Sequence, residues 1–380
     1  MPKKVTILDV ARLAGVSRTT VSRVLNQKGE VDPATRERVQ RIIEEQSFVP
    51  SLTAAGLAGG HSRLIGMLVP TFTWTMIPEL LRGIADVINN TPYELVLYSY
   101  NDEDLSRDQS VIIKRVMATQ LTAGILAVFP GRISAQLTRL YQQGLPVVVI
   151  DDQFDQTIPW VHADNVTGAY LAVQHLIQLG HRRIAHIQGP PEYLASHDRY
   201  NGYRRALQEV GITPDPELVL TGDFLPPSGR ACAEQLFVLP PEKRPTAIFA
   251  ATDQMAYGVL SAAEEHGLSV PGDVALVGFD DDTPSAHVRP PLTTIRQPSF
   301  EMGKSGIELV LSLVAASDEP AAQQHSLFKS TKDGSTPVQP HPIKPARIEL
   351  QTSLIVRASC GSSYHVDWQH SNSKMGGTQS

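Results

Sequence analysis

The segment from Arg18 to Asn26 carries side chains that could bind a polyanion. Its polar members are Arg18, Thr19, Ser22, Arg23 and Asn26. Guanidinium, hydroxyl and carboxamide groups reach the phosphates and base edges of a DNA major groove. The apolar residues between them, Val21, Val24 and Leu25, recur at helical spacing. We therefore expect a helix whose apolar side lies in a small core and whose polar side contacts DNA; a merely solvated polar side is the alternative.

Residues that start and stop helices surround this segment. Thr6 is a favourable N-cap, and Asp9 three residues later completes a variant of the capping box. Gly15 allows a tight turn, and Ser17 can cap the next helix. A further N-cap at residue 32, followed by Pro33, opens a third helix. The sequence therefore predicts a helix-turn-helix followed by a third helix.

Charge is distributed unevenly along the 380 residues. The first 60 residues carry nine basic and six acidic side chains, a formal charge of +3 in a chain whose total is −6. This asymmetry suits a polyanionic partner for one end of the chain, although a solvated helix surface also explains it. Cys232 and Cys360 have no spacing typical of a disulfide framework or a zinc site. No apolar run reaches transmembrane length and no signal peptide is recognisable, which favours the cytoplasm.

From Leu64 onward, apolar strand-like runs alternate with helix-length segments. The runs are LIGMLVP, YELVLYSY, AGILAVF, LPVVVID, RIAHIQG, AIFAAT and VALVGFD. Such alternation predicts parallel sheets with helices on both faces, and so many strands fit two similar subdomains better than one sheet. Neither GxGxxG nor GxxxxGK[ST] occurs at a strand end, so nucleotide binding has no support.

Acidic residues stand at the ends of three of these runs. Asp151 ends VVVID, Asp253 follows AIFAAT, and Asp280 ends VALVGFD. Ligands of open α/β sheets bind beyond the carboxyl ends of the strands, so these carboxylates should face one cleft. Phe72 and Trp74, after the first run, are candidates for stacking on a ligand. Carboxylates together with an aromatic surface suit a polyhydroxylated ligand.

Each of these residues also has a structural explanation. Asp253 and Asp281 could be N-caps or structural acceptors, and Trp74 could anchor the surface of a lobe. The run from Asp280 to Asp282 could suggest a metal site. Successive strand residues point to opposite faces, however, and no histidine stands with the run, so we expect neither a metal nor a cofactor.

The head of the chain resembles a known family. VTILDVARLAGVSRTTVSRVLN is similar to the helix-turn-helix of the LacI/GalR family of bacterial transcription regulators, and RERVQRIIEEQSFVP to its third helix and the approach to its hinge. The resemblance implies base reading by Arg18, Thr19 and Arg23. It implies phosphate contacts by Thr6, Ser17, Thr20, Ser22 and Asn26. It implies a small core that contains Val10, Ala11, Val21 and Val24.

The segment SLTAAGLAGGHSRLIGMLVP resembles the hinge of this family, which becomes a short helix on DNA. A leucine of that helix enters the minor groove between base pairs, and Leu57 is the matching residue. Ser51 replaces the usual asparagine, and Gly56 precedes Leu57; a glycine inside a helix costs about 1 kcal/mol relative to alanine. We expect residues 50–61 to fold only on DNA, with a plain flexible linker as the alternative.

The body of the chain resembles the effector-binding core of the same family, which is shared with periplasmic sugar-binding proteins. The matching segments are HLIQLGHRRIAHIQG, ATDQMAYGVL, PGDVALVGFDD, PPLTTIRQP and LIVRAS. The resemblance runs from about Val5 to Ser359 and implies two Rossmann-like lobes joined by three crossovers. The expected divisions are a DNA-binding domain over 1–49, the hinge over 50–61, a first lobe over 62–163 plus 297–318, and a second lobe over 164–296 plus 343–358.

The resemblance also implies ligand-binding positions. Arg199, in DRYNGY, matches the main ligand-gripping arginine of the family, and Asp280 matches its carboxylate partner. Thr252 stands where asparagine is common, beside Asp253, and Gln297 lies at a crossover. These positions imply a sugar or related small molecule between the lobes.

The C-terminal part of the chain departs from the family pattern. Residues 319–342 are rich in Pro, Ser, Gln and Lys, which predicts a mobile loop, and residues 359–380 are expected to form a disordered tail. The tail has no apolar heptad, so a tetramer is disfavoured. We expect a homodimer, because a pseudo-palindromic operator in double-stranded DNA needs two heads.

These observations predict a cytoplasmic, DNA-binding repressor whose operator affinity depends on a small-molecule effector, with no membrane partner and no catalysis. A sugar-binding transport protein is the main alternative, and it explains the body but not the head. An enzyme that uses Asp280 and Asp151 is a further alternative, but the sequence shows neither a nucleophile–base pair nor a phosphate loop.

Overall fold

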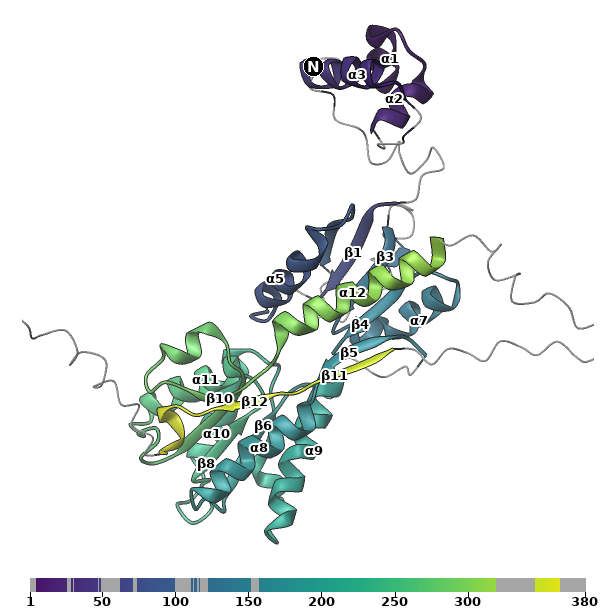
Figure 1. The fold of residues 1–380 in the computed structure, drawn as a ribbon. Helices are drawn as coiled ribbons and strands as arrows, with labels where there is room; N and C mark the ends of the chain where they lie inside the picture. Colours follow the sequence, from purple (N-terminus) through teal and green to yellow (C-terminus); the bar gives the residue numbers. More distant parts are fainter. Residues whose placement is uncertain are drawn as a thin grey trace, which may run out of the picture. The chain divides into compact units, whose positions relative to one another are not determined.

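The computed structural model divides into two compact units, residues 1–64 with 119–123 and residues 65–118 with 124–380 (Figure 1). The residues that it describes are 5–25, 29, 31–46, 48, 62–70, 74–99, 111, 113–114, 116, 122–151, 157–318 and 346–362. Several expectations lie outside the described residues. They concern Asn26, Leu57 and Phe72, the hinge over 50–61 and the insertion over 319–342.

The described residues of the first unit form three helices, α1 (Ile7–Ala14), α2 (Arg18–Leu25) and α3 (Pro33–Glu45). The capping box is present, since the backbone N–H of Asp9 donates to Thr6 Oγ1 at 3.3 Å and the N–H of Thr6 donates to Asp9 Oδ2 at 3.0 Å. Gly15 ends α1 in the left-handed region at φ 64°, where glycine is unstrained. Asp32 caps α3 by accepting from the N–H of Thr35 at 3.0 Å. These local signals confirm the predicted helix-turn-helix.

The three helices enclose a small apolar core. Its buried members are Val10, Ala11, Ala14, Val21, Val24, Val39 and Phe48. All four core residues that the sequence predicts are among them. Because the apolar side of α2 is used in this core, its polar side is left for solvent or for a partner.

The described strands form two six-stranded sheets, which lie in the second unit except for Leu64 and residues 122–123. The first sheet, in the order β11-β5-β4-β3-β1-β2, consists of β1 (Leu64–Val69), β2 (Glu94–Ser99), β3 (Thr122–Val128), β4 (Val147–Ile150), β5 (Trp160–Ala163) and β11 (Arg347–Leu350). The second sheet, in the order β12-β10-β9-β8-β6-β7, consists of β6 (Ile184–Gln188), β7 (Val219–Thr221), β8 (Ala247–Ala250), β9 (Ala275–Asp280), β10 (Thr293–Arg296) and β12 (Ser353–Ile355). The inner strands pair in parallel, and β12 is antiparallel to β10.

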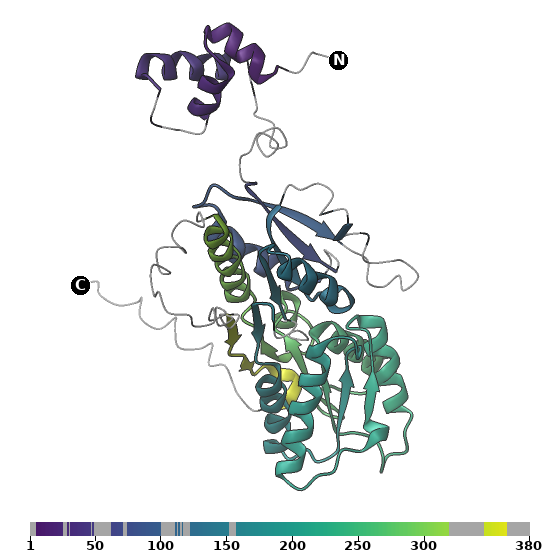
Figure 2. The ribbon, with the colours of Figure 1, turned by 90° about the vertical axis from the view of Figure 1, so that its right-hand side faces the viewer.

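Helices cover both faces of the sheets (Figure 2). The first lobe adds to its sheet α5 (Ile77–Ile88), η1 (Gly131–Ile133), α7 (Ser134–Gln142) and α12 (Ser299–Asp318). The second lobe adds α8 (Asn165–Gln178), α9 (Leu194–Glu209), η2 (Pro216–Leu218), α10 (Pro226–Phe237), α11 (Asp253–Glu265), η3 (Thr283–Ala286) and η5 (Ala358–Cys360). Along β8, Ile248 and Ala250 pack under α10 and α11, whereas Ala247 and Phe249 pack under α8 and α9. This alternation is the reason that the central strands are apolar on both faces.

The chain passes between the two sheets three times, from β5 to α8, from β10 to α12 and from β11 to β12. The prediction that residues 343–358 all belong to the second lobe is therefore wrong for β11. This strand pairs in parallel with β5, and Ile348 lies opposite Val161. Its partly exposed, alternating residues suit the edge of a sheet, and nothing in its short sequence says which sheet it will join.

The expected disordered tail also begins later than residue 359. Ser359 and Cys360 are buried, and Ser359 Oγ accepts from the N–H of Thr293 at 2.8 Å and donates to the carbonyl of Leu276 at 2.6 Å. These hydrogen bonds fix Ser359 against β9 and β10, and the described part continues to residue 362. Within the described residues, the helices are too short or too polar to cross a lipid bilayer.

Candidate nucleic-acid interface and ligand pocket

Helix α2 separates its polar and apolar side chains as the sequence predicts. Arg18, Thr19 and Arg23 are exposed, whereas Val21 and Val24 are buried. The first turn of α2 contains no acidic residue, so no carboxylate neutralises the positive end of its dipole. The exposed side can therefore approach a nucleic acid without burying a carboxylate.

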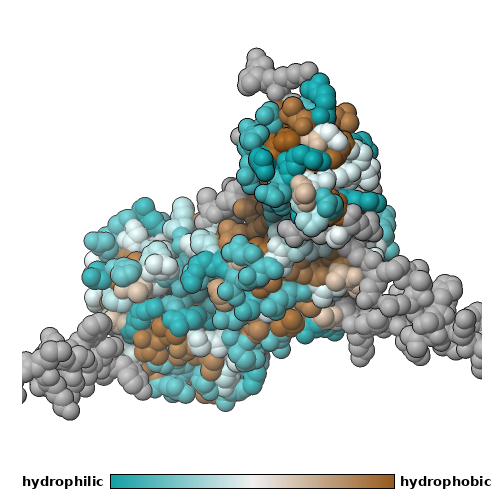
Figure 3. All heavy atoms as spheres, turned by 45° about the horizontal axis from the view of Figure 1, so that its top comes forward, coloured by the Kyte–Doolittle hydropathy of each residue, from teal (hydrophilic) through white to brown (hydrophobic). Residues whose placement is uncertain are grey.

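The residues expected to contact phosphates gather at two helix starts. Thr6 precedes α1, and Ser17 precedes α2, where its Oγ accepts from the N–H of Thr20 at 3.1 Å. Amide groups at helix starts favour phosphate oxygens. Ser22 is half-buried on α2 itself. Figure 3 shows that hydrophilic atoms cover most of the visible surface of this head, with a smaller apolar area between them.

A pocket lies where strands of both lobes end. Its described lining consists of Trp74, Thr75, Met76, Phe129, Ala195, Arg199, Phe224, Leu225, Thr252, Gln254, Asp280 and Gln297. The first lobe contributes the residues that follow β1 and β3. The second lobe contributes those that follow β7 and β8, the last residue of β9 and the start of α9, and Gln297 follows β10 at a crossover. This is the carboxyl end of parallel strands, where ligands of open α/β sheets bind.

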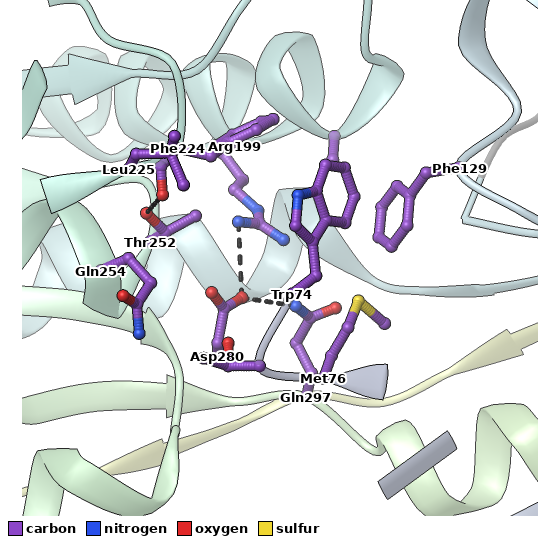
Figure 4. Close-up of a pocket in the computed structure, with 12 residues that line it drawn as sticks. Trp74, Met76, Phe129, Arg199, Phe224, Leu225, Thr252, Gln254, Asp280 and Gln297 are labelled. Atoms are coloured by element: carbon purple, nitrogen blue, oxygen red, sulfur yellow. Dashed lines mark hydrogen bonds and ion pairs between the residues drawn. The ribbon is translucent and has the colours of Figure 1, made fainter. Parts of the chain in front are cut away.

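Arg199 and Asp280 form the charged pair of this pocket (Figure 4). Nη1 of Arg199 lies 3.6 Å from Oδ1 of Asp280, and its Nε donates to Asn165 Oδ1 at 2.9 Å. The guanidinium also donates to the carbonyl of Ala251 and lies 3.8 Å from the ring centre of Phe279. These contacts hold a charged group that is only 2% exposed. The structure thus pairs the two residues as the resemblance implied.

Burial governs the protonation of this pair. Burial raises the pKa of Asp280 to about 8, although Arg199 acts in the opposite direction. Burial likewise lowers the pKa of Arg199 from its usual value, and the nearby carboxyls oppose this. Both shifts have the same cause, because removal from water disfavours the charged form of either group.

Two expected ligand residues lie outside the described lining. Asp253 is fully buried, its Oδ2 accepts from the N–H of Asp282 at 2.9 Å and from Ser285 Oγ, and its Oδ1 accepts from Thr294. These bonds join α11 to η3 and β10, so Asp253 is a structural acceptor. Asp151 is also buried, and its Oδ1 accepts from Asn165 Nδ2 at 3.2 Å. The strand-end rule predicted that both carboxylates face the cleft, but neither belongs to the described lining.

Aromatic rings from both lobes meet at Trp74. Its ring centre lies 5.1 Å from that of Phe129, 5.9 Å from Tyr193 and 6.4 Å from Phe224. Phe129 and Phe224 have φ angles of 46° and 70°, a left-handed conformation that is unusual for bulky residues and often marks functional sites. The sequence offered a signal for Phe129, which ends AGILAVF, but none for Phe224 or Tyr193.

The remaining lining residues differ in how far the sequence identified them. Thr252 lines the pocket, but its hydroxyl caps α11 by accepting from the N–H of Met255 at 3.2 Å. Gln297 lines the pocket from a crossover and donates to Asp280 Oδ1 at 2.5 Å. Gln254 was not expected from the sequence, nor were the apolar side chains of Met76, Ala195 and Leu225.

Comparisons with known proteins cover both parts of the chain. Residues 6–51 match the bacterial regulatory proteins of the lacI family, and residues 173–336 match a periplasmic binding protein-like domain. Catabolite control protein A of Priestia megaterium is 34% identical over 351 residues, which cover 92% of this chain and 99% of that protein.

Two solved structures are similar over almost the whole chain. The transcriptional regulator CelR in its cellobiose complex shares 31% identity with a TM-score of 0.66, and the match covers 93% of this chain and 99% of that one. The lac repressor dimer bound to operator and the anti-inducer ONPF shares 27% identity with a TM-score of 0.77, and the match covers 94% and 99%.

Proposed function

Because the chain belongs to the LacI family of bacterial regulatory proteins, we propose that a small molecule in its pocket controls the affinity with which the two α2 helices of a homodimer bind operator DNA. The chain is a DNA-binding transcriptional regulator with a helix-turn-helix head and an effector-binding core. The observation that carries the proposal is the composition of the pocket. Trp74 and Phe129 come from the first lobe, and Arg199 and Asp280 come from the second.

The head supports sequence-specific binding by a repressor. Arg18, Thr19 and Arg23 are exposed on one side of α2, where guanidinium and hydroxyl groups can reach base edges. Thr6, Ser17, Thr20 and Ser22 supply phosphate contacts in the proposal, and so does Asn26; Leu57 supplies the minor-groove wedge. The lac repressor structure is a dimer on its operator. A homodimer of this chain would place two heads on a pseudo-palindromic site.

The pocket supports a polyhydroxylated effector, most simply a sugar. Arg199, Asp280 and Gln297 offer fixed donors and acceptors, and Trp74 offers an apolar ring for the C–H face of a sugar. In the CelR structure the bound molecule is cellobiose. The effector of this chain is therefore proposed to be a sugar or a related molecule of similar polarity.

Coupling to DNA requires that the effector bind one arrangement of the lobes more tightly than another. The residue after Asp280 provides a connection to the crossovers. Asp281 Oδ2 accepts from Arg296 Nε at 2.7 Å, and Asp281 Oδ1 accepts from Arg357 Nη2 at 2.6 Å. Arg296 precedes the crossover to α12, and Arg357 follows the crossover to β12. A ligand that moves Asp280 would thus act on two of the three connections between the lobes.

The same observations guide the remaining assignments. Relatives of this chain are transcriptional regulators, and we infer that the protein does not catalyse a reaction. A regulator of DNA acts in the bacterial cytoplasm, and we place this chain there. A sugar-binding transport protein would share the effector-binding core, but its function would not explain a helix-turn-helix with an exposed polar side on α2.

The test is a binding titration of the full-length protein on fluorescent operator DNA. Candidate sugars and nucleosides are added, and their turnover is assayed in parallel. We expect one ligand to change the operator affinity in either direction while remaining unconverted. Ligand binding without any sequence-specific DNA binding would favour the transport protein, and turnover without DNA binding would favour an enzyme.

A further inference from the structure

Cys360 and His175 form a contact that the proposed function does not use. Cys360 is the last residue of η5, and His175 lies in the last turn of α8. Nε2 of His175 is 3.3 Å from Sγ of Cys360. A thiol beside an imidazole can pass its proton to the ring nitrogen and become a thiolate, which is the nucleophilic form of cysteine.

Two hydroxyl groups also lie against this sulfur. Thr293 Oγ1 accepts from the backbone N–H of Arg357 at 2.8 Å, so its own hydrogen can be donated to Sγ of Cys360, 3.1 Å away. Ser362 Oγ is 3.4 Å from Sγ. The thiol form can instead donate to the carbonyl of Arg357 at 3.5 Å. Ionisation therefore loses one hydrogen bond and strengthens those from the imidazole and the two hydroxyls.

The position of His175 favours a positive charge beside the sulfur. The C-terminal end of a helix carries a partial negative charge, which stabilises a protonated imidazole in the last turn. The side chain of His175 is only half-buried, so its charged form keeps part of its hydration. Burial raises the pKa of the Cys360 thiol, but the hydrogen bonds from His175, Ser362 and Thr293 lower it, with a net result of about 7 instead of 9.0.

Cys232 provides a comparison within the same lobe. It belongs to the core beneath α10 and α11, whereas Cys360 belongs to the core on the α8 and α9 side of the sheet, and both are free thiols. Sγ of Cys232 donates to the carbonyl of Thr221 at 3.6 Å. Burial raises the pKa of Cys232, and Asp223 acts in the same direction. Cys232 is 4% exposed and Cys360 is 1% exposed, so greater exposure cannot explain a faster reaction of Cys360.

We propose that Cys360 and His175 form a reactive thiolate–imidazolium pair, which hydrogen peroxide oxidises to a sulfenic acid. The thiolate attacks one oxygen of the peroxide, so that an S–O bond forms and the O–O bond breaks. The sulfur gives up an electron pair to the peroxide, and the departing hydroxide takes the proton of the imidazolium and becomes water. Hydrogen peroxide is small and uncharged, and the exposed Gly361 directly follows Cys360 in the chain.

The test compares the two cysteines of the unaltered, full-length protein. Reduced protein is treated with hydrogen peroxide at neutral pH, catalase stops the reaction, and the remaining thiols are alkylated in denaturant. Mass spectrometry of the two cysteine peptides gives each rate. We expect Cys360 to react at least about tenfold faster than Cys232, because a larger share of Cys360 is thiolate. Equal rates, or a Cys360 that remains reduced, would overturn the proposal.

Two matched variants test the role of His175. His175→Gln keeps a donor but cannot carry the charge. His181→Gln makes the same change just beyond the end of α8, where the ring lies 3.0 Å from Thr246 Oγ1. We expect the oxidation rate of Cys360 to rise with pH through a midpoint near 7, and His175→Gln to slow the reaction several-fold and raise that midpoint. Equal pH profiles for two folded variants would contradict the pairing.

The same contacts connect Cys360 to a crossover between the lobes. Arg357, whose N–H binds Thr293, donates through Nη2 to Asp281 Oδ1 at 2.6 Å. Because Cys360 is buried, an oxygen added to its sulfur must displace a neighbouring group. Oxidation should therefore shift Arg357 at the crossover to β12. This consequence rests on the proposed function, in which the arrangement of the lobes sets the operator affinity.

Operator titrations before and after oxidation measure this consequence. We expect peroxide to change the operator affinity several-fold in the unaltered protein and in Cys232→Ser, and to leave that of Cys360→Ser unchanged. Unchanged affinity after complete oxidation of Cys360 would reject the link to DNA binding and leave the reactive pair. If the reduced protein bound no operator at all, the proposed function would fail, whereas the two oxidation rates would still decide whether the pair is reactive.

Discussion

Nη1 of Arg199 and Oδ1 of Asp280 lie 3.6 Å apart, and the two side chains are 3% and 13% exposed. Replacement of Arg199 by Met would leave Asn165 Oδ1 and the carbonyl of Ala251 without their donor, and Asp280 without its cation. Each buried acceptor left without a donor costs about 1–3 kcal/mol, so we expect the free energy of unfolding to fall in urea denaturation, with loss of effector binding in calorimetry. Arg199→Lys keeps the charge but not the fork of donors to Asn165 and Ala251. An Arg199→Met variant with unchanged stability would refute the role of the pair.

The protonation of Asp280 predicts a dependence of stability on pH. Its pKa is raised from the ordinary 3.8 to about 8, so the folded state holds a proton that the unfolded chain releases. This contribution is complete below pH 4 and is lost as the pH rises toward 8. We expect the free energy of unfolding to fall over that window, and to fall less in Asp280→Asn. Parallel urea titrations at several pH values measure the difference, and parallel slopes for the two proteins would contradict it.

Asp253 is expected to stabilise the second lobe without contacting the ligand. Asp253→Ala removes the acceptor used by Asp282, Ser285 and Thr294, and leaves buried donors without partners. Each unpartnered donor costs about 1–3 kcal/mol, so unfolding at clearly lower urea is expected. Effector affinity of the protein that remains folded should change little. An Asp253→Ala protein that is as stable as the unaltered protein but no longer binds effector would contradict this prediction and would identify Asp253 as a ligand contact.

Trp74 is expected to contact the effector and not merely to anchor a lobe. Trp74→Leu keeps an apolar side chain but removes the ring that meets Phe129, Tyr193 and Phe224. Removal of an aromatic ring from the ligand costs about 0.5–1.5 kcal/mol, or roughly two- to tenfold in affinity. Calorimetry measures this effect, and Phe237→Leu, in the core of the same unit, serves as the stability control. A lower melting temperature of Trp74→Leu with unchanged affinity for effector would instead show that Trp74 only anchors a lobe.

The sequence predicts the head of this protein in detail because its signals are local. Thr6 with Asp9, Gly15 and Asp32 act within a few residues of their own positions, and each occupies the expected place. The alternating apolar runs likewise predict parallel sheets, since strands buried on both faces need continuous apolar sequence. Local hydrogen bonding and burial thus suffice for these elements.

The structural features that the sequence does not predict depend on contacts between residues far apart in the chain. The pairing of β11 with β5 joins positions about 190 residues apart in the chain, and a four-residue strand carries no mark of its partner. Asp253 and Asp280 both stand at strand ends, yet only Asp280 lines the pocket, because Ser285 and Thr294 occupy Asp253. Phe224 of the second lobe contacts Trp74 of the first lobe, and its backbone is in the left-handed region. The residues next to Phe224 in the sequence do not predict this backbone conformation.

The central claim is that the exposed side of α2 recognises operator DNA and that ligand binding in the pocket changes the affinity for that DNA. The most direct measurement compares the full-length protein with the Arg18→Ala/Arg23→Ala variant, on operator and on random DNA, with and without effector. Removal of each arginine from its base should cost about 1–3 kcal/mol of discrimination. We expect the variant to bind operator and random DNA alike while still binding effector normally. A variant that chose operator as sharply as the unaltered protein would contradict the account.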